Sequence, residues 1–247
     1  LYILLMKVAL TFWGTQKYIE FLPNWYESLE DKFLPGIDKE YFAFTDGEIG
    51  DAPDNLHLMP IPDYGFPDTF NMTFEEMLKL EDKVDGCDWL VSVDADMNVF
   101  EEIKYDEFFD DSKKYIGVHH PCHFMGMGPH DKYPGCYDIN PNSNACTKDI
   151  LDMSIYWQGC LWGGRVPYIF DMMRKIDAWT KDDVDRDVQA RYYEESYMNR
   201  WFLEHTDETH TLHASFAFPE LFEQYCNFPK KIVHLAKDNK SLGNNEW

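Results

Sequence analysis

The segment CDWLVSVDADMNVF, residues 87–100, decides the fold prediction. Its centre, WLVSV (residues 89–93), is a continuous apolar run, typical of a strand that is buried on both faces. Asp94 and Asp96 follow this strand directly. In open α/β sheets, ligands bind beyond the carboxyl ends of the strands. The segment therefore predicts an inner strand with two carboxylates at the ligand-binding edge of the sheet.

The Asp-x-Asp pattern alone carries little information in so acidic a chain. With 27 aspartates in 247 residues, about three matches arise by chance. Alternate residues that leave a strand can direct both carboxylates at one hard divalent cation, so only the match at Asp94 and Asp96 predicts a metal site. The other two matches, 183–185 and 185–187, lie in an acidic stretch over 181–187 that we interpret as a solvent-exposed turn.

Strand and helix patterns alternate along the first half of the chain, which predicts an α/β fold with a mostly parallel sheet. One expected helix has Thr73 at its N-cap and Glu76 three residues later, the spacing of a capping box. The expected strands cover residues 8–13, 41–45, 57–61 and 89–93, and the expected helices cover 17–34 and 73–83.

The second half begins with residues 121–144, which are rich in Gly, Pro, His, Asn and Tyr and show no periodicity. We predict a long loop there, and such loops in compact domains are usually either functional or disordered. We found no repeat and no linker, so residues 1–247 are predicted to form a single domain. The expected later elements are an extended segment over 156–164, helices over 168–179 and 189–205, and a basic tail with Lys230, Lys231, Lys237 and Lys240.

The net charge of −23 argues against nucleic acid or an anionic membrane as a partner, because both require Lys and Arg to neutralise phosphates. A phosphorylated ligand would need a local cation; the alternative explanation of the charge is solubility in a salty habitat. The six cysteines show no zinc or C-x-x-C spacing, so we expect free thiols in a reducing compartment. The apolar stretch 1–10 is too short to span a bilayer and is interpreted as part of a first strand.

Three further groups of residues are candidates for a site. Glu194 and Glu195 lie among aromatic residues on a predicted helix, where a carboxylate can act as a base or stabilise charge; the alternative is a surface pair. In YWQGCLWGG, residues 156–164, small residues between bulky ones allow a ligand to approach the backbone, or simply pack as a strand. For His119 and His120 we favour hydrogen bonding or packing over metal binding.

Taken in order along the chain, these blocks resemble family 6 of the glycosyltransferases, which includes the ABO blood-group transferases, the α1,3-galactosyltransferases and microbial and viral relatives. The resemblance covers nearly the whole chain and implies a GT-A-type, Rossmann-like single domain with helices on both faces of the sheet. About residues 1–96 would bind the nucleotide, and about 97–247 would bind the sugars and form a smaller acceptor-side subregion. The similar blocks are YFAFTD, CDWLVSVDADMNVF, IGVHHPCHF, YDINPNSNA, YWQGCLWGG, EESYMNRWFL and HLAKDNKSLGNN.

The resemblance implies transfer of galactose or N-acetylgalactosamine from UDP-galactose or UDP-N-acetylgalactosamine, in α1,3 linkage and with retention, to a galactoside or fucosyl-galactoside. It also implies Mn²⁺, with Mg²⁺ as the alternative, as cofactor. Glu195 would be the catalytic carboxylate. His120, Gln158, Gly159, Cys160 and Glu194 would contact the donor or acceptor sugar. The metal and nucleotide would be bound by Trp13, Tyr18, Asp94, Ala95, Asp96 and Lys237.

Several residues depart from the family pattern. No Arg precedes Arg165, and Gly243 replaces an Arg of the tail, so diphosphate binding is expected to depend on the metal and Lys237. Tyr197 stands in place of a His. Cys160 leaves less room than glycine for an acetamido group, which favours galactose. The alternatives are a transferase of another family, a donor hydrolase and an inactive sugar-binding relative. We expect a cytoplasmic protein, or a Golgi-lumen one if the chain is part of an animal enzyme.

Overall fold

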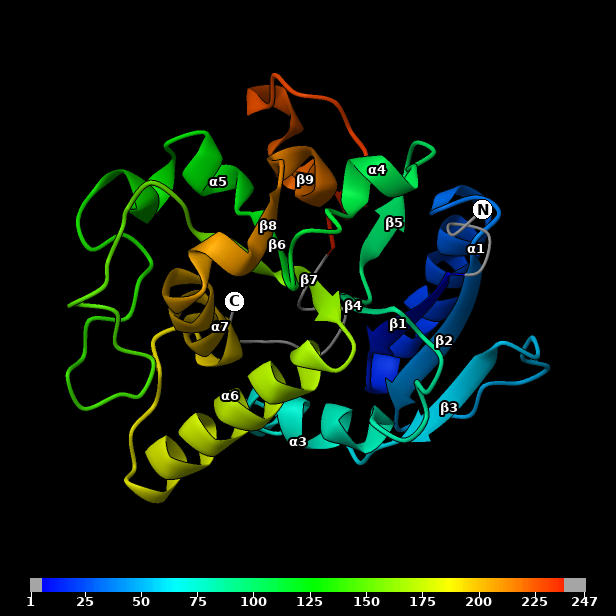
Figure 1. Ribbon diagram of the computed structural model, residues 1–247, viewed down its shortest axis with the longest axis horizontal. Coiled ribbons are helices and arrows are strands. Elements are labelled where there is room, and N and C mark those ends of the chain that lie inside the picture. Colours follow the sequence, from blue (N-terminus) through cyan, green and yellow to red (C-terminus); the bar gives the residue numbers. More distant parts are fainter. Residues whose placement is uncertain (1–5, 238–247) are drawn as a thin grey trace.

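A computed structural model describes residues 6–237 of the chain, and it places an α/β sheet of seven strands at the centre (Figure 1). The strand order is β3-β2-β1-β4-β7-β6-β8. The strand WLVSV is β4, Trp89–Val93, in the middle of this order, as predicted. The other strands are β1 (Lys7–Trp13), β2 (Asp38–Thr45), β3 (Leu56–Pro60), β6 (Tyr115–His119), β7 (Trp157–Arg165) and β8 (Thr209–Leu212).

The sheet is mostly parallel, as predicted. The strands β3, β2, β1 and β4 pair in parallel, and so do β6 and β8. Only β7 runs against its neighbours, pairing antiparallel with both β4 and β6. Because β7 is reversed, its first residues lie beside the last residues of β4, and Val93 pairs with Leu161. The edge beyond Asp94 is therefore built by the end of one strand and the start of another.

Helices cover both faces of the sheet, as Figure 1 shows. Along β1, Val8, Leu10 and Phe12 pack with α1 (Leu22–Lys32), while Ala9 faces the opposite core. This alternation follows from the two-residue period of a strand. The second core is formed with α3 (Thr73–Met77), α6 (Tyr168–Asp185) and α7 (Tyr193–Glu204).

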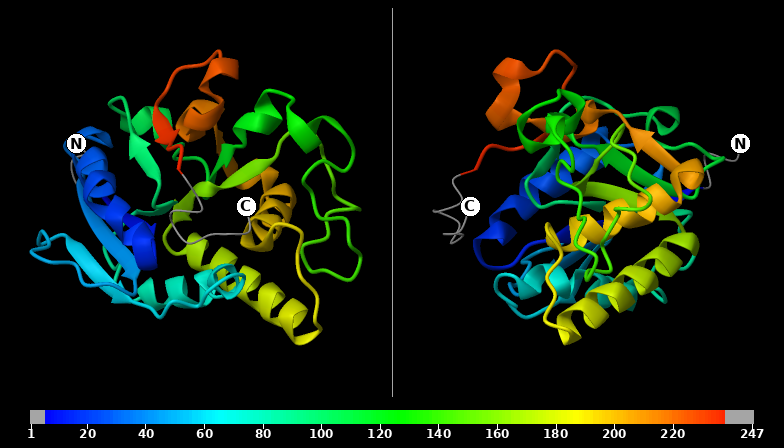
Figure 2. Two further views of the ribbon diagram at one scale, coloured as in Figure 1. Left: turned by 180° about the vertical axis from the view of Figure 1, so that it is seen from behind. Right: turned by 90° about the vertical axis from the view of Figure 1, so that its left-hand side faces the viewer.

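A smaller sheet, β5-β10-β9, lies on the α1 side, and it carries the chain back toward the end of β4. Its strands are β5 (Met97–Val99), β9 (Phe218–Pro219) and β10 (Ile232–His234). The segment between β6 and β7 contains only short helices, α5 (Pro121–Phe124) and a 3₁₀ turn at Gly128–Asp131, so the predicted loop is largely confirmed. In Figures 1 and 2 this segment forms a lobe beside α7.

Two predicted helices were wrong in detail. Residues 17–34 form a 3₁₀ helix at Gln16–Phe21 and then α1, with Pro23 in its first turn, where the missing N–H costs least. Thr73 is not an N-cap: its hydroxyl donates to the Thr69 carbonyl oxygen (3.0 Å). The chain is already helical at α2 (Asp68–Asn71), so the capping box predicted there does not form.

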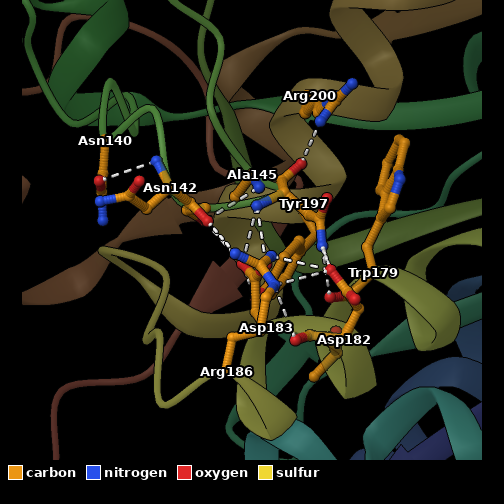
Figure 3. A network of polar contacts seen from close by, with 12 residues as sticks. Asn140, Asn142, Ala145, Trp179, Asp182, Asp183, Arg186, Tyr197 and Arg200 are labelled. Carbon is orange, nitrogen blue, oxygen red and sulfur yellow. Dashed lines mark hydrogen bonds and ion pairs between the residues drawn. The ribbon is translucent and has the colours of Figure 1, made fainter.

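The predicted turn over 181–187 was also wrong, because α6 continues to Asp185 and buries Asp183 completely. Figure 3 shows Asp183 at the centre of a polar network that joins α6, α7 and the lobe. A carboxylate can be buried when enough donors satisfy it. Its donors are Ser143 Oγ (2.8 Å), the Asn144 backbone N–H (2.8 Å), Tyr197 Oη (2.9 Å) and Arg186 Nη2 (2.5 Å).

Two expectations about the whole chain were tested as well. All six cysteines are free thiols, as predicted. Over residues 6–237, none of the helices combines the length and apolar character that crossing a membrane demands. The predicted tail residues Lys240 and Gly243 lie outside the described residues.

Candidate active site

The end of β4 brings Asp94 and Asp96 to the predicted edge of the sheet. The Asp94 backbone N–H donates to the Cys160 carbonyl oxygen of β7 (2.9 Å), which fixes the two segments side by side. The Asp94 side chain is exposed, whereas Asp96 is only 2% exposed. One carboxylate thus faces the solvent and the other lies beneath it.

Asp96 is held by residues of the C-terminal segment. Its Oδ2 accepts from His234 Nε2 (3.0 Å) and from Lys237 Nζ, and its carbonyl oxygen accepts from the Leu235 backbone N–H (2.9 Å). Burial alone would raise the pKa of Asp96, but His234 and Lys237 lower it far below its usual value. Although the Asp94 carboxylate is open to solvent on one side, the protein that surrounds it on the other sides and the nearby charge of Asp96 raise its pKa. Asp96 is therefore negatively charged, whereas the negative charge of Asp94 would be stabilised by a further cation.

Lys237 also connects this pair to the predicted nucleotide-binding residues. Its ammonium group lies 5.0 Å from the centre of the Tyr18 ring, so Tyr18, Asp96 and Lys237 are close together. Trp13 ends β1; its indole N–H donates to Thr69 Oγ1 (3.2 Å) and its ring stacks on Phe44. The Ala95 side chain is packed in the core. This leaves only the Ala95 backbone for the predicted nucleotide contact.

Glu195 lies in the first turn of α7, facing the first residues of β7. Its Oε1 accepts from Tyr156 Oη (2.6 Å) and its Oε2 accepts from the Gly159 backbone N–H (2.8 Å). The pKa of Glu195 is raised by burial, although both hydrogen bonds oppose this shift. The result is a fixed carboxylate that is poorly hydrated and adjoins the edge of the sheet.

Asn199, one turn later on α7, fastens the helix to β7. Its Nδ2 donates to the carbonyl oxygens of Trp157 (2.8 Å) and Glu195 (2.9 Å), and its Oδ1 accepts from the Trp157 backbone N–H (2.9 Å). The Asn199 amide thus hydrogen-bonds the Trp157 backbone N–H and carbonyl oxygen as a neighbouring strand would. It also fixes the distance between Glu195 and the sheet.

Among residues 6–237, two buried acceptor atoms at this edge of the sheet, Glu194 Oε2 and Gln158 Oε1, have no hydrogen-bond partner. We use the word cleft for the place where Asp94, Gln158, Glu194 and Glu195 come together. Burial raises the pKa of Glu194 well above its usual value. The other end of the Gln158 amide, Nε2, lies 3.4 Å from His234 Nδ1. Unpaired buried acceptors are costly, and a ligand with several hydroxyl or amide N–H donors would satisfy them.

His120 follows β6 at the same edge and belongs to a group of histidines. Its Nδ1 accepts from the Cys122 backbone N–H (3.1 Å) and caps α5, so Nε2 is the atom that carries the proton. Burial lowers the pKa of His120 to about 3, that of His119 to about 4 and that of His130 to about 4. His120 is therefore a neutral hydrogen-bond donor. Within the described part of the chain, no three His, Cys, Asp or Glu side chains are grouped to hold a metal.

A separate hollow of about 390 Å³ lies between α1, β5 and β10. Three of its polar side chains have protein partners: Ser28 Oγ accepts from the Val99 N–H (3.1 Å), Lys32 donates to the Phe100 carbonyl oxygen (3.3 Å), and Lys230 pairs with Glu223. The residues that the resemblance implies for catalysis and metal binding do not line this hollow.

Sequence reasoning named most of the residues in this cleft but missed Tyr156, Asn199 and His234. Two of them had a usable signal. Asn199 lies four residues after Glu195, on the same face of the helix, and Tyr156 alternates with Gln158 along an extended segment. His234 offered no signal, because only the folded chain places it on Asp96.

Comparison with known proteins identifies the family of this chain. The model of glycosyltransferase family 6 matches residues 2–241. The chain belongs to this family. It is similar to the O-antigen biosynthesis glycosyltransferase WbnI of Escherichia coli, with 25% identity over 96% of this chain and 97% of the relative.

Two animal proteins are also similar. Mouse globoside alpha-1,3-N-acetylgalactosaminyltransferase 1 is 27% identical over 81% of this chain, and the alignment covers 58% of that protein. Rat histo-blood group ABO system transferase 1 is 22% identical over 96% of this chain and 68% of its own length. The chain is thus a family 6 glycosyltransferase that spans nearly all of the bacterial relative and about three fifths of the mouse one.

Proposed function

We propose that this glycosyltransferase moves galactose or N-acetylgalactosamine from a UDP-sugar, in α1,3 linkage and with retention, onto a galactoside or fucosyl-galactoside. The observation that carries the proposal is the cleft with Glu195 fixed beside the unpaired acceptors of Glu194 and Gln158. Sugar hydroxyls are the donors these atoms lack. The names of the mouse and rat relatives support the choice of sugar and linkage.

The proposed cofactor is Mn²⁺, with Mg²⁺ as the alternative. Asp94 and Asp96 fit a hard divalent cation that takes one or two carboxylates from the protein and its other oxygens from the ligand. The raised pKa of Asp94 indicates a carboxylate short of positive charge. When bound, such an ion neutralises the charge that develops on a leaving diphosphate. Lys237, held between Asp96 and Tyr18, is the proposed protein cation for the same diphosphate.

The proposed role of Glu195 is to stabilise positive charge at the anomeric carbon as the bond to UDP breaks. A carboxylate with both oxygens hydrogen-bonded keeps its charge and its direction, which is electrostatic preorganisation. It acts either by forming a transient bond to the anomeric carbon or through its charge alone. The acceptor hydroxyl then bonds to the anomeric carbon from the face that UDP left, its proton passes to the departing diphosphate, and retention follows.

The proposed donor preference is for galactose. The Cys160 side chain is buried beneath the cleft, near Asp94 and Glu195, and its thiol fills volume that glycine would leave empty. An acetamido group needs that volume. For the acceptor, the proton on His120 Nε2 is the proposed donor to a galactoside hydroxyl.

The decisive experiment incubates the protein and Mn²⁺ with a panel of UDP-sugars and with lactose or fucosylated lactose. Mass spectrometry should detect a product heavier by one hexose, and the ¹H coupling constant of its new linkage should indicate the α-anomer. Release of free galactose alone would identify a hydrolase. Binding of the acceptor without donor consumption would identify a sugar-binding relative and contradict the proposal.

A matched variant, Cys160→Gly, tests the donor preference. The ratio of kcat/KM for UDP-galactose to that for UDP-N-acetylgalactosamine should fall by about tenfold, the usual worth of a small steric change. An unchanged ratio would remove Cys160 from donor selection.

A further inference from the structure

Tyr156 is a fully buried tyrosine whose hydroxyl serves a single carboxylate. Its Oη donates to Glu195 Oε1 at 2.6 Å, a distance typical of a strong, charge-assisted hydrogen bond. Burial and the charge of Glu195 hold the pKa of Tyr156 well above its usual value, so the phenol keeps its proton. Tyr156 is therefore a permanent donor to Glu195.

The remaining contacts of Glu195 come from backbone atoms or act at a distance. Gly159 donates its N–H to the other carboxylate oxygen, and Asn199 fixes the backbone of the helix turn. Within residues 6–237, Tyr156 is the only side chain that donates to the Glu195 carboxylate. It is thus the one contact that a substitution can remove without moving the strand or the helix.

Among the residues that the structure describes, the groups that face this pair carry no positive charge. The Tyr156 ring packs edge-on against Tyr137 (5.0 Å between ring centres) and lies 5.1 Å from His130 and 5.8 Å from His120, whose pKa values are lowered by burial. The other titratable groups that face Tyr156 or Glu195 are Cys136, Tyr192, Glu194, Asp94 and Cys160. Against these neutral or acidic neighbours, the phenol hydrogen bond stabilises the charged form of Glu195.

We propose that Tyr156 is a positioning residue for the transfer reaction, which keeps the Glu195 carboxylate charged and pointed at the donor sugar. This inference rests on the proposed function of Glu195 and adds a second residue to it. The structural part of Tyr156, its ring, fills the core between β7 and the lobe, and the functional part is the hydroxyl alone.

The test compares Tyr156→Phe with the control Tyr137→Phe. Tyr137 belongs to the same cluster, but its hydroxyl donates to the carbonyl oxygens of Asp152 (3.0 Å) and Ile155 and does not reach Glu195. Both variants lose one buried hydroxyl, so both should lose similar thermal stability. Only Tyr156→Phe should lower kcat, by about 10- to 100-fold at pH 7, with little change in KM for the UDP-sugar.

The pH profile separates positioning from loss of structure. Without the phenol, Glu195 takes up a proton more readily, so the acidic limb of kcat for Tyr156→Phe should move to higher pH by about one to two units. Tyr137→Phe should keep the wild-type profile. An unshifted limb, or equal losses of kcat in both variants, would overturn the proposal.

The double variant, Glu195→Gln with Tyr156→Phe, distinguishes a failure of the proposed role of Tyr156 from a failure of the proposed role of Glu195. If Glu195→Gln lowers kcat strongly and Tyr156→Phe adds nothing in that background, the two residues act as one unit, as proposed. If Glu195→Gln is as active as wild type, the role of Glu195 itself is wrong. If Glu195→Gln is inactive but Tyr156→Phe keeps the wild-type kcat, Glu195 acts without Tyr156.

Discussion

Two buried carboxylates on neighbouring helices have opposite surroundings. Asp183 of α6 accepts from four donors and is completely buried. Glu194 of α7 has a buried oxygen that finds no hydrogen-bond partner within residues 6–237. A saturated carboxylate stabilises the fold, whereas an unsaturated one costs stability until a ligand supplies donors. Hydrogen-bond saturation therefore separates the structural Asp183 from Glu194 of the cleft.

The largest expected effect is on the turnover number and concerns Glu195, the neighbour of Glu194 in the cleft. Glu195→Gln should lower kcat by about a thousandfold, because a neutral amide cannot stabilise positive charge at the anomeric carbon. Its melting temperature should not fall. The control is Glu204→Gln at the exposed end of the same helix, which removes only a pair with Arg200. Turnover close to wild type in Glu195→Gln would remove this residue from the chemistry.

Chelation tests the two aspartates. Treatment with EDTA should reduce activity by about a hundredfold or more, and added Mn²⁺ should restore it, since stabilisation by a bound cation is worth several kcal/mol. Asp94→Asn should weaken Mn²⁺ binding measured by electron paramagnetic resonance, while Asp185→Asn, at the exposed last residue of α6, should not. Activity that survives chelation contradicts the proposed cofactor.

On the structural side, Asp183→Ala should cost about 3–5 kcal/mol of stability, because it leaves buried donors and Arg186 without their partner. For a chain of this length the melting temperature should drop by roughly 10 °C. At temperatures where the variant is folded, kcat should stay close to wild type. A loss of kcat without a loss of stability would place Asp183 in the reaction and erase the contrast.

The smallest expected effect is a gain in stability, where Asp183→Ala gives a loss. Glu194→Gln should raise stability by about 1 kcal/mol at pH 8, because it removes a poorly satisfied charge. The pKa of Glu194 is raised in the folded state, so folding binds its proton more tightly and wild-type stability falls as pH rises. The gain from the substitution should therefore be larger at pH 8 than at pH 5 in thermal unfolding. An equal gain at both values would show that folding does not raise the pKa of Glu194.

The central part of the fold was predictable from sequence because local patterns determine it. The run at residues 89–93 is too apolar to lie anywhere but inside the sheet, and that placed Asp94 and Asp96 correctly. The reversed direction of β7 was not predictable, since an apolar strand has the same pattern in either direction. The burial of Asp183 was missed for a related reason: its donors come from residues about 40 positions before it and 14 after it.

Sequence analysis predicted most of the residues in the cleft but not the contacts between them. Resemblance to the family supplied Glu195, His120 and Lys237 as candidates, but no short-range pattern pairs Tyr156 with Glu195, which is 39 residues away. The ion pair between Lys237 and Asp96 spans 141 positions. Contacts of this length depend on the whole topology, so only the folded chain reveals them.

The hydrogen bonds from Asn199 to β7 have a consequence for which part of the enzyme opens first. The Asn199 side chain holds the start of α7 on the sheet, whereas β4 is hydrogen-bonded to a strand on each side. Regions with few such contacts open locally at a lower free energy than central strands do. In hydrogen exchange, the first turn of α7 should open more easily than β4, so that mild denaturant silences the enzyme while its central sheet remains intact.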